Sequence, residues 1–436
     1  MNETDTLSPE SSPLRIANFR AYFVSRLTMT LAQYAMMLII GWQTYNIARD
    51  SGLGVAEASG QLALIGLLQF VPLFLLTPFS GWAADHFDRR NVARLTMLAQ
   101  LGCAATLTWF TWSETLTITA LFGVAIVLGI VRAFNGPALS ALAPNLVPKT
   151  ILPNAIALSS IAWQTGMIVG PAIGGYTHAI YPALPYAFAC VLFGVAITAL
   201  SSIGKVPQPP REANKRPIHQ MVEGLRYVVR NKMVLGAITL DLFAVFLAGA
   251  TALFPVFARD ILQVGETGLA QLAMAPAVGA ALTALWFSFR PLKTNVGPRM
   301  LWAVGIFGMA TIIFGFSKWM PLSLAMLFIV GAADMFSVYI RQSLIQLHTP
   351  DDKRGRVSSV SLLTISASNE FGDFFSGSLA FLIGPVFAVV GGGVGAIVTV
   401  AIWARIFPVL RTTRTFDPPE ELLDSPPEEK LQEQMP

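Results

Sequence analysis

Ten consecutive residues decide the fold of this chain: Gly81-Trp82-Ala83-Ala84-Asp85-His86-Phe87-Asp88-Arg89-Arg90. They lie where one apolar run of helix length ends and the next begins. Gly81 has no side chain, so another helix backbone can approach closely there, and Asp85 follows one turn later, where the chain leaves the bilayer. Arg89 and Arg90 face the cytoplasm if basic residues mark the inner side. The plain alternative is a charged turn that only stops two helices from sliding out of the bilayer.

The composition is that of an integral membrane protein. Of 436 residues, 54% are hydrophobic and 12% are charged, and the mean hydropathy is +0.60, whereas soluble proteins are about a quarter charged. Cys103 and Cys190 lie inside apolar runs and are expected to be small core residues. The four histidines have no metal-ligand spacing, so no metal or other cofactor is expected. The first 18 residues are polar and acidic, which predicts no cleaved signal peptide.

Twelve apolar runs predict twelve transmembrane helices. A span needs about 20 mostly apolar residues, and membrane helices tolerate the glycines and prolines found inside these runs. The fold class is therefore predicted as all-α and membrane-integral, with runs at 19–47, 59–83, 91–111, 116–140, 151–178, 183–204, 233–258, 266–288, 298–317, 321–346, 357–382 and 385–407.

The longest gap between runs, residues 205–232, divides the twelve runs six and six. Within it, residues 221–230 place apolar residues at helical spacing with arginines between them, which is typical of a helix lying in the membrane surface. Pro148 and Pro350 each precede the fifth run of their half, a weak internal repeat that fits two six-helix pseudo-repeats. The predicted domains are a cytoplasmic tail at 1–18, a six-helix bundle at 19–204, a cytoplasmic linker with an interfacial helix at 205–232, a second bundle at 233–407 and a disordered cytoplasmic tail at 408–436.

Lysines and arginines give the orientation. If the N-terminus is placed inside, the outside gaps hold little beyond Arg49, Arg259 and Lys318. The inside gaps and termini hold most of the remaining basic residues of the loops and tails, so both termini are predicted to be cytoplasmic.

Six ionisable residues fall deep inside the runs. A charge at a helix centre costs at least about 2.5–3.5 kcal/mol, so each is a candidate functional residue. They are Arg26, Arg132, Asp241, Asp334, Glu370 and Asp373.

Two readings stay open for these residues. Asp334 and Glu370 have no cation close in sequence and are the strongest candidates for carrying a proton, because a buried carboxylate without a partner can titrate near neutral pH. Arg26 and Asp241 could instead form a structural salt bridge between the halves. Asp373 could be a core acid bonded to Ser376 or to a neighbouring hydroxyl.

The run at 151–178 carries Gly166-Met167-Ile168-Val169-Gly170-Pro171-Ala172-Ile173-Gly174-Gly175. Glycines every four residues make a flat helix face, and Pro171 removes one backbone hydrogen bond and permits a bend. Ordinary close packing of helices is the alternative to a transport role for this motif.

Three motifs in this order resemble the major facilitator superfamily of membrane transporters. The residues at 81–90 resemble its signature loop G-x-x-x-D-x-x-x-R-[RK], Arg132 with Gly136 resembles its helix 4 motif, and Gly166–Gly175 resembles the G-x-x-x-G-P-x-x-G-G motif of its antiporters. Asp88 replaces a glycine that is usual in the loop. Softer cues at 18–23, 224–227 and 350–357 resemble the enterobactin-exporter-like branch.

The resemblance implies alternating access around a cavity between the halves. Arg132 is expected to help move protons or to line the cavity. Asp85 is expected to contact the start of the eleventh run, near Arg356, and to hold the cytoplasmic side shut. The implied function is a proton-coupled exporter of a small organic compound, such as a siderophore or a drug, in the bacterial inner membrane. Its partners would be that substrate, protons and the bilayer, with no nucleic acid, and the protein would be a monomer.

Two other functions stay open. An uptake or facilitated-diffusion permease is disfavoured by the antiporter-like motif. A non-transporting sensor or assembly subunit belongs to a different class, and no appended signalling segment supports a sensor. The sequence also contains no nucleophile, metal or phosphate-binding motif that would indicate an enzyme.

Overall fold

The computed structural model describes residues 12–204, 217–290 and 292–416. Within these ranges side chains are described except at residues 78, 81–86, 141, 149, 153, 217–221, 351, 352, 354, 355, 359, 362, 363, 366, 367 and 370.

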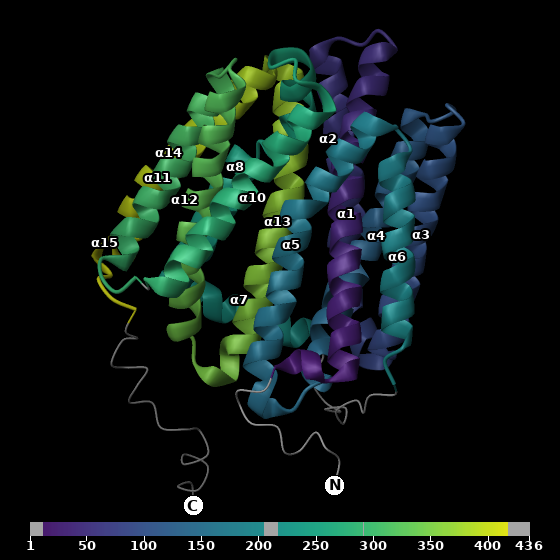
Figure 1. Cartoon of the computed structure of the whole chain (residues 1–436). Coiled ribbons are helices and arrows are strands. Elements are labelled where there is room, and N and C mark those ends of the chain that lie inside the picture. The colour runs from purple at the N-terminus through teal and green to yellow at the C-terminus, as the bar shows by residue number, and fades with distance from the viewer. Residues whose placement is uncertain (1–11, 205–216, 291, 417–436) are drawn as a thin grey trace, which may run out of the picture.

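Long antiparallel helices form two halves (Figure 1). The first half contains α1 (Ala17–Asp50), α2 (Val55–His86), α3 (Arg89–Trp112), α4 (Ile118–Leu142), α5 (Leu152–Ile180) and α6 (Leu184–Ser201). The second contains α8 (Lys232–Ala248), α10 (Gly265–Phe289), α11 (Val296–Phe316), α12 (Met320–Leu347), α13 (Asp351–Ile383) and α14 (Pro385–Ile406). Between α8 and α10 the chain continues through η5 (Thr251–Leu253), α9 (Phe254–Val256) and the π-helix η6 (Phe257–Ile261).

Ten of the described helices are long and apolar enough to cross a membrane. The all-α membrane fold is therefore confirmed. Of the twelve predicted spans, ten correspond to described helices with the length and composition of a membrane span. The other two long helices are α3 and α13, which occupy the places of the third and eleventh predicted runs. Helix α3 carries Arg89, Arg90 and Arg94 near its start, and Phe371–Ile383 is the apolar end of α13 that the described residues show.

The halves are built on the same plan and meet along two helix pairs. Inside the first half α1 packs on α5 and α6, and inside the second α8 packs on α13 and α14. Between the halves α2 packs on α13, and α5 packs on α10. We call the end of the bundle where α1 begins and α14 ends the terminal face, and the other end the opposite face (Figure 1).

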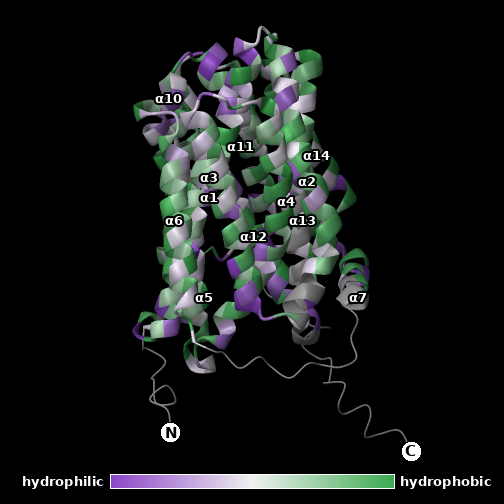
Figure 2. Cartoon of the chain, turned by 90° about the vertical axis from the view of Figure 1, so that its right-hand side faces the viewer, coloured by the Kyte–Doolittle hydropathy of each residue, from purple (hydrophilic) through white to green (hydrophobic). Residues whose placement is uncertain are grey.

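A short helix, α7 (Pro217–Arg230), joins the halves and lies at the terminal face beside the lower end of α13 (Figures 1 and 2). Gly224 allows the contact, because a Cβ there would lie 2.8 Å from the Arg356 carbonyl oxygen of α13. Glu223 pairs with Arg356 at 2.8 Å, and the Tyr227 hydroxyl donates to the His348 carbonyl at 2.9 Å. A helix is thus present in the predicted linker, and it is attached to the second half.

The chain stays ordered beyond α14. Helix α15 (Pro408–Thr412) is followed by residues whose carbonyls cap the start of α11: the Val296 and Gly297 N–H groups donate to the Arg414 and Thr413 carbonyls at 3.3 and 3.1 Å. Phe416 packs edge-on against Tyr339. The predicted disordered tail is therefore corrected for residues 408–416, because the free N–H groups at the start of α11 require partners; residues 417–436 lie outside the described part.

Candidate functional site

A buried ion pair and a second acid lie inside the second half. Asp241 of α8 forms an ion pair with Arg341 of α12, and the two residues are only 7% and 3% exposed. Asp334 lies seven residues before Arg341, on the same face of α12. Charges buried this deeply are costly unless they are paired, so the Asp241–Arg341 contact is what makes this cluster tolerable inside the bundle.

A small cavity lies between the two acids of this cluster. Asp241, Asp334 and Ser337 line it together with Ala244 and Phe307, and its volume of about 10 Å³ has room for about one water molecule. In the described part of the chain Asp334 has no hydrogen bond or ion pair. The cavity therefore brings a carboxyl group without a partner next to a buried ion pair. No cluster of His, Cys, Asp or Glu that could hold a metal ion occurs among the described residues.

Arg26 does not pair with Asp241, so the salt bridge between the halves that the sequence left open is wrong. The Arg26 Nη1 donates to the Tyr22 hydroxyl at 3.2 Å. That hydroxyl lies 3.1 Å from the Ser159 hydroxyl of α5. The reason is packing: α1 lies against α5 and α6, whereas α8 lies against α13 and α14, so Arg26 and Asp241 each find a partner within their own half.

Arg132 lies in the first half and contacts α2. Its Nη1 donates to the Gln69 side-chain oxygen at 3.4 Å, and Gln69 is buried. The two helices touch because Gly129 leaves no room for a Cβ against the Gln69 backbone. The structure thus places Arg132 on a different half from Asp334, and its role in proton movement stays a prediction.

The glycine motif of α5 packs against α1. An added Cβ at Gly170 would lie 2.7 Å from the Tyr34 Cβ, and one at Gly174 would lie 2.6 Å from the Ala35 carbonyl oxygen. Gly166 is equally close to Thr30, while Gly175 faces Ala270 of α10. Pro171 lies inside the helix. The flat face predicted from the spacing is therefore used within the first half, and its last glycine is used at the boundary between the halves.

Asp373 of α13 accepts a hydrogen bond from the Thr251 hydroxyl at 3.0 Å. This agrees with the alternative of a neighbouring hydroxyl, which is that of Thr251 in η5. The side chains of Glu370, Gly81 and Asp85 lie outside the described residues, and so does the expected contact between Asp85 and the start of α13.

Asp88, the departure from the signature loop, is the N-cap of α3. Its carboxylate accepts the Arg90 backbone N–H at 2.9 Å and pairs with the Arg90 guanidinium at 2.7 Å. The Arg90 side-chain hydrogen bond is the main reason that the pKa of Asp88 lies below its ordinary value. Arg90 also donates to the Ile203 carbonyl at 3.1 Å, so it ties the start of α3 to the end of α6. Arg90 is therefore a structural residue of the loop, and Arg89 lies beside it at the start of α3.

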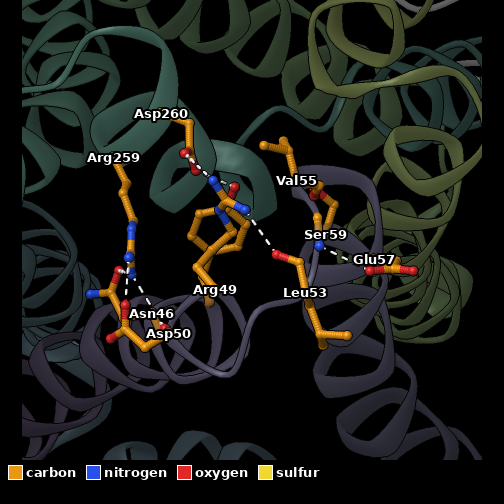
Figure 3. A network of polar contacts seen from close by, with 11 residues as sticks. Asn46, Arg49, Asp50, Leu53, Val55, Glu57, Ser59, Arg259 and Asp260 are labelled. Carbon is orange, nitrogen blue, oxygen red and sulfur yellow. Dashed lines mark hydrogen bonds and ion pairs between the residues drawn. The ribbon is translucent and has the colours of Figure 1, made fainter.

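A network of charges fastens the two halves at the opposite face (Figure 3). At the end of α1, the Arg49 Nη2 lies 3.0 Å from the Asp260 Oδ1 of η6, and the Tyr45 hydroxyl donates to the Asp260 Oδ2 at 2.5 Å. The Arg259 Nη2 lies 2.6 Å from the Asp50 Oδ1, and its Nη1 donates to the Asn46 side chain at 2.6 Å. Every one of these bonds crosses from one half to the other.

The network follows the internal repeat. The tripeptide Ala48-Arg49-Asp50 ends α1, and the same tripeptide, Ala258-Arg259-Asp260, lies in η6, at the end of the corresponding first span of the second half. Each arginine pairs with the aspartate of the other tripeptide. Such reciprocal pairing is what a two-fold relation between two copies of one surface produces.

The halves also meet in this end of the bundle along α2 and α13. Gly377 lies against Ala63, and Gly66 lies against the Phe374 backbone. The Phe70 and Phe371 rings pack at a tilt with their centroids 5.3 Å apart. Phe70 lies half-way along the 32-residue α2, so these described contacts cover its half toward the opposite face. The opposite face is therefore closed.

Sequence reasoning missed Arg341 and the crossed pairs. Arg341 lies inside the run at 321–346, so the argument from burial that identified Asp334 also applies to it. It was overlooked because it lies near the end of the run, where a charge costs little free energy. Arg49 and Arg259 were counted only as sparse outside charges. The repeated Ala-Arg-Asp tripeptide was the available signal.

Comparison with known proteins gives a consistent result. A family model described as Major Facilitator Superfamily matches residues 19–372. The chain is 23% identical to the enterobactin exporter EntS of Escherichia coli O1:K1 / APEC over 422 residues, 95% of this chain and 97% of that protein. It is 25% identical to the multidrug efflux pump Tap of Mycobacterium tuberculosis (strain ATCC 25618 / H37Rv) over 334 residues, 74% of this chain and 79% of that protein.

Solved structures share the fold. A D-xylose–proton symporter superposes with a TM-score of 0.66 at 14% identity, covering 90% of this chain and 98% of that one. A POT family transporter in complex with 5-aminolevulinic acid superposes with a TM-score of 0.67 at 14% identity, covering 91% and 96%. At this identity the likeness concerns the architecture of the helices alone.

Proposed function

Because this chain belongs to the Major Facilitator Superfamily, we propose that it is a proton-coupled exporter of a small organic compound, such as a siderophore or a drug. The observation that carries the proposal is the buried Asp241–Arg341 ion pair, with Asp334 lining the same small cavity as Asp241. The names of two relatives, an enterobactin exporter and a multidrug efflux pump, support export as the direction.

The cluster suggests how a proton is coupled to the movement of the halves. A charged Asp334 is costly in a cavity that holds about one water molecule, so its protonated form is favoured while water is excluded. When the cavity opens and water enters, Asp334 can ionise and compete with Asp241 for Arg341. Proton release would then change a buried ion pair that joins α8 to α12, the two helices that carry the cluster.

The crossed Ala-Arg-Asp pairs supply the second part of the cycle. They hold the opposite face shut, and access from that face requires the Arg49–Asp260 and Arg259–Asp50 pairs to separate. We place the terminal face in the cytoplasm of a bacterial inner membrane, with both termini inside, because the loops of that face carry most of the basic residues. The protein would act as a monomer, since each monomer contains both halves.

Transport in inside-out membrane vesicles tests the function. Vesicles that contain the protein are acidified inside and given either a catecholate siderophore or ethidium outside, and uptake of each compound is followed. Accumulation that depends on the acid interior and disappears with a protonophore supports proton-coupled export. Equilibration without accumulation would indicate facilitated diffusion, and uptake driven by the opposite gradient would indicate a symport permease; either result contradicts the proposal.

A further inference from the structure

A pocket at the terminal face of the second half has no part in the proposed transport cycle. It measures about 460 Å³ and lies between the start of α8, the end of α12 and the segment after α15. Its lining residues are Asn231, Lys232, Met233, His348, Val409, Thr413, Arg414 and Thr415.

The pocket offers positive charge and hydrogen-bond donors without a carboxylate. Lys232 and Arg414 are both exposed, and no acidic residue is among the lining residues. Arg414 uses one nitrogen to donate to the Asn295 side chain at 2.6 Å, which fixes the guanidinium beside the start of α11. The side chain of Asn231 is occupied in capping α8. His348 is buried, and burial lowers its pKa, so the positive charge of the pocket rests on Lys232 and Arg414.

The pocket lies at the level where membrane-spanning segments begin and end. The span of α8 starts at Lys232, that of α12 ends at Leu347, and that of α11 starts at Val296, which bonds to Arg414. Groups at this level meet phospholipid headgroups rather than hydrocarbon. An anion that reaches the pocket from the bilayer is therefore a headgroup phosphate.

Helix α7, which ends one residue before the pocket, has the surface of a helix that lies in the interface. Its inner side contacts α13 and is buried, whereas Val222, Leu225 and Val229 are 43%, 51% and 56% exposed. These three residues form one stripe at helical spacing, and the exposed Arg226 and Arg230 lie along one side of it. An apolar stripe bordered by arginines is complementary to acyl chains bordered by anionic headgroups.

We propose that the pocket of Lys232 and Arg414, together with the outer face of α7, binds an anionic glycerophospholipid of the surrounding leaflet. The phosphate lies between the lysine and the arginine, with the Thr415 hydroxyl as an additional donor, and α7 rests its apolar stripe in the same leaflet. Helix α7 is bonded to α12 and α13 and packs more extensively on α13 and α8 than on α2 of the first half, so the lipid binds mainly to the second half of the molecule.

Native mass spectrometry of the purified full-length protein tests this inference. The protein is titrated with phosphatidylglycerol and, separately, with phosphatidylcholine, and the lipid-bound fraction is measured. The test variant is Lys232→Gln with Arg414→Gln. The control variant is Arg405→Gln with Arg411→Gln, which removes two exposed arginines of the same face that do not line the pocket. A second variant, Leu225→Gln with Val229→Gln, tests the contribution of α7.

We expect phosphatidylglycerol to bind more tightly than phosphatidylcholine. The Lys232/Arg414 variant should lose roughly 30-fold in affinity for the anionic lipid, and the control variant should keep it. Equal binding of the anionic lipid by both variants would overturn the proposal. Displacement of the lipid by an equal concentration of glycerol 3-phosphate would instead identify a site for soluble phosphate esters and would contradict the membrane source. The circular dichroism spectrum and the melting temperature of each variant show whether it is folded.

Discussion

The two buried aspartates of the second half differ in their roles: Asp241 is held in an ion pair with Arg341, and Asp334 is the proposed proton carrier. The pair is buried and satisfied, so its loss should damage the fold, because an unpaired buried charge costs about 3–5 kcal/mol. Asp334 has no described partner, so an amide can replace it at little structural cost. This difference makes Asp334 the residue at which a functional role can be separated from a structural one.

We expect Asp334→Asn to abolish accumulation driven by a pH gradient while downhill exchange of substrate continues, because an amide cannot take up and release a proton. Both activities are measured in the inside-out vesicles described above. Ser337→Ala, which changes another group lining the same cavity without changing charge, serves as the control. Wild-type accumulation by the Asp334→Asn protein would exclude this acid as the proton carrier.

Asp88 carries a prediction about pH. Its pKa lies below the ordinary value of 3.8, chiefly because of the Arg90 side chain, so its ionised form stabilises the folded protein. That contribution is fully present above the ordinary pKa and is lost as the pH falls through the lowered one. Asp88→Ala should cost about 1 kcal/mol from loss of the helix cap, and this deficit should be constant from neutral pH down to about pH 5 and shrink in stronger acid.

Thermal unfolding of the detergent-solubilised protein, followed by intrinsic fluorescence, measures this deficit. Asp88→Asn is the matched variant, because asparagine also caps helices well but cannot form the ion pair. It should fall between the wild type and Asp88→Ala. A deficit of Asp88→Ala that grows on acidification would show that the sign is wrong.

Individual charged residues were found from the sequence more easily than their partners. Depth in an apolar run identified Asp241 and Asp334, because a charge far from water is costly whichever residue later pairs with it. The partner of Asp241 depended on which helices pack together and on how each is rotated. Neither quantity can be read from a run of apolar residues, so Arg26 was offered as the partner and Arg341 was missed.

Glycine spacing has its effect at the scale of helix pairs. The Gly174 Cα lies so close to α1 that a Cβ would be 2.6 Å from the Ala35 carbonyl oxygen. Gly174→Ala should therefore push α5 and α1 apart and cost about 1–3 kcal/mol of stability. Gly194→Ala is the control, since nothing lies within 4 Å of the position of its Cβ. This control should be neutral or stabilising by up to about 1 kcal/mol. Equal melting temperatures for the two variants would contradict the packing role.

Helix positions followed well from the sequence because membrane helices are hydrophobic on all sides and their length is set by the bilayer. The prediction was weaker where a helix is not apolar along its whole length. In α13 a helix of 33 residues is apolar enough only near its end, and residues 408–416 form a helix and a cap although they follow the last span. The π-helix η6, which positions Arg259 and Asp260, could not be predicted from amino-acid composition.

At the scale of the whole molecule, the crossed Ala-Arg-Asp pairs set the balance between closed and open forms of the opposite face. We expect Arg49→Asp to repel Asp260 and to open this face more often. The readout is maleimide labelling of Ala48→Cys, a position that is buried in the closed form, in a protein whose two native cysteines are alanine. Labelling should be at least about fivefold faster, which corresponds to the loss of about 1 kcal/mol.

Reversal of both charges distinguishes a pair across the halves from a local effect. The Arg49→Asp, Asp260→Arg protein should return toward the slow labelling of the wild type. Glu57→Gln should leave labelling unchanged, because Glu57 accepts a hydrogen bond from Gly54 of its own half (Figure 3). If the double reversal labels as fast as Arg49→Asp alone, the pair does not hold the face shut.

The overall architecture was accessible from the sequence because the three motifs each mark a fixed place in one known fold. The relation of the halves was not, since a pairing such as Arg49 with Asp260 joins residues more than 200 positions apart. Only the internal repeat contains information about such contacts, and only if each copy is assumed to meet the other. The candidate site was therefore predicted as separate residues, and its connections came from the structure.

The packing of residues 408–416 decides where a reporter can be joined to this protein. A fluorescent protein fused directly after residue 407 would replace the carbonyls that cap α11 and the ring that contacts Tyr339. Fused after Phe416, it would leave both contacts in place. Cytoplasmic fluorescence of C-terminal fusions is a direct way to examine the proposed orientation. A dark fusion at 407 would then report a damaged second half, and only the fusion after 416 can report the side of the membrane.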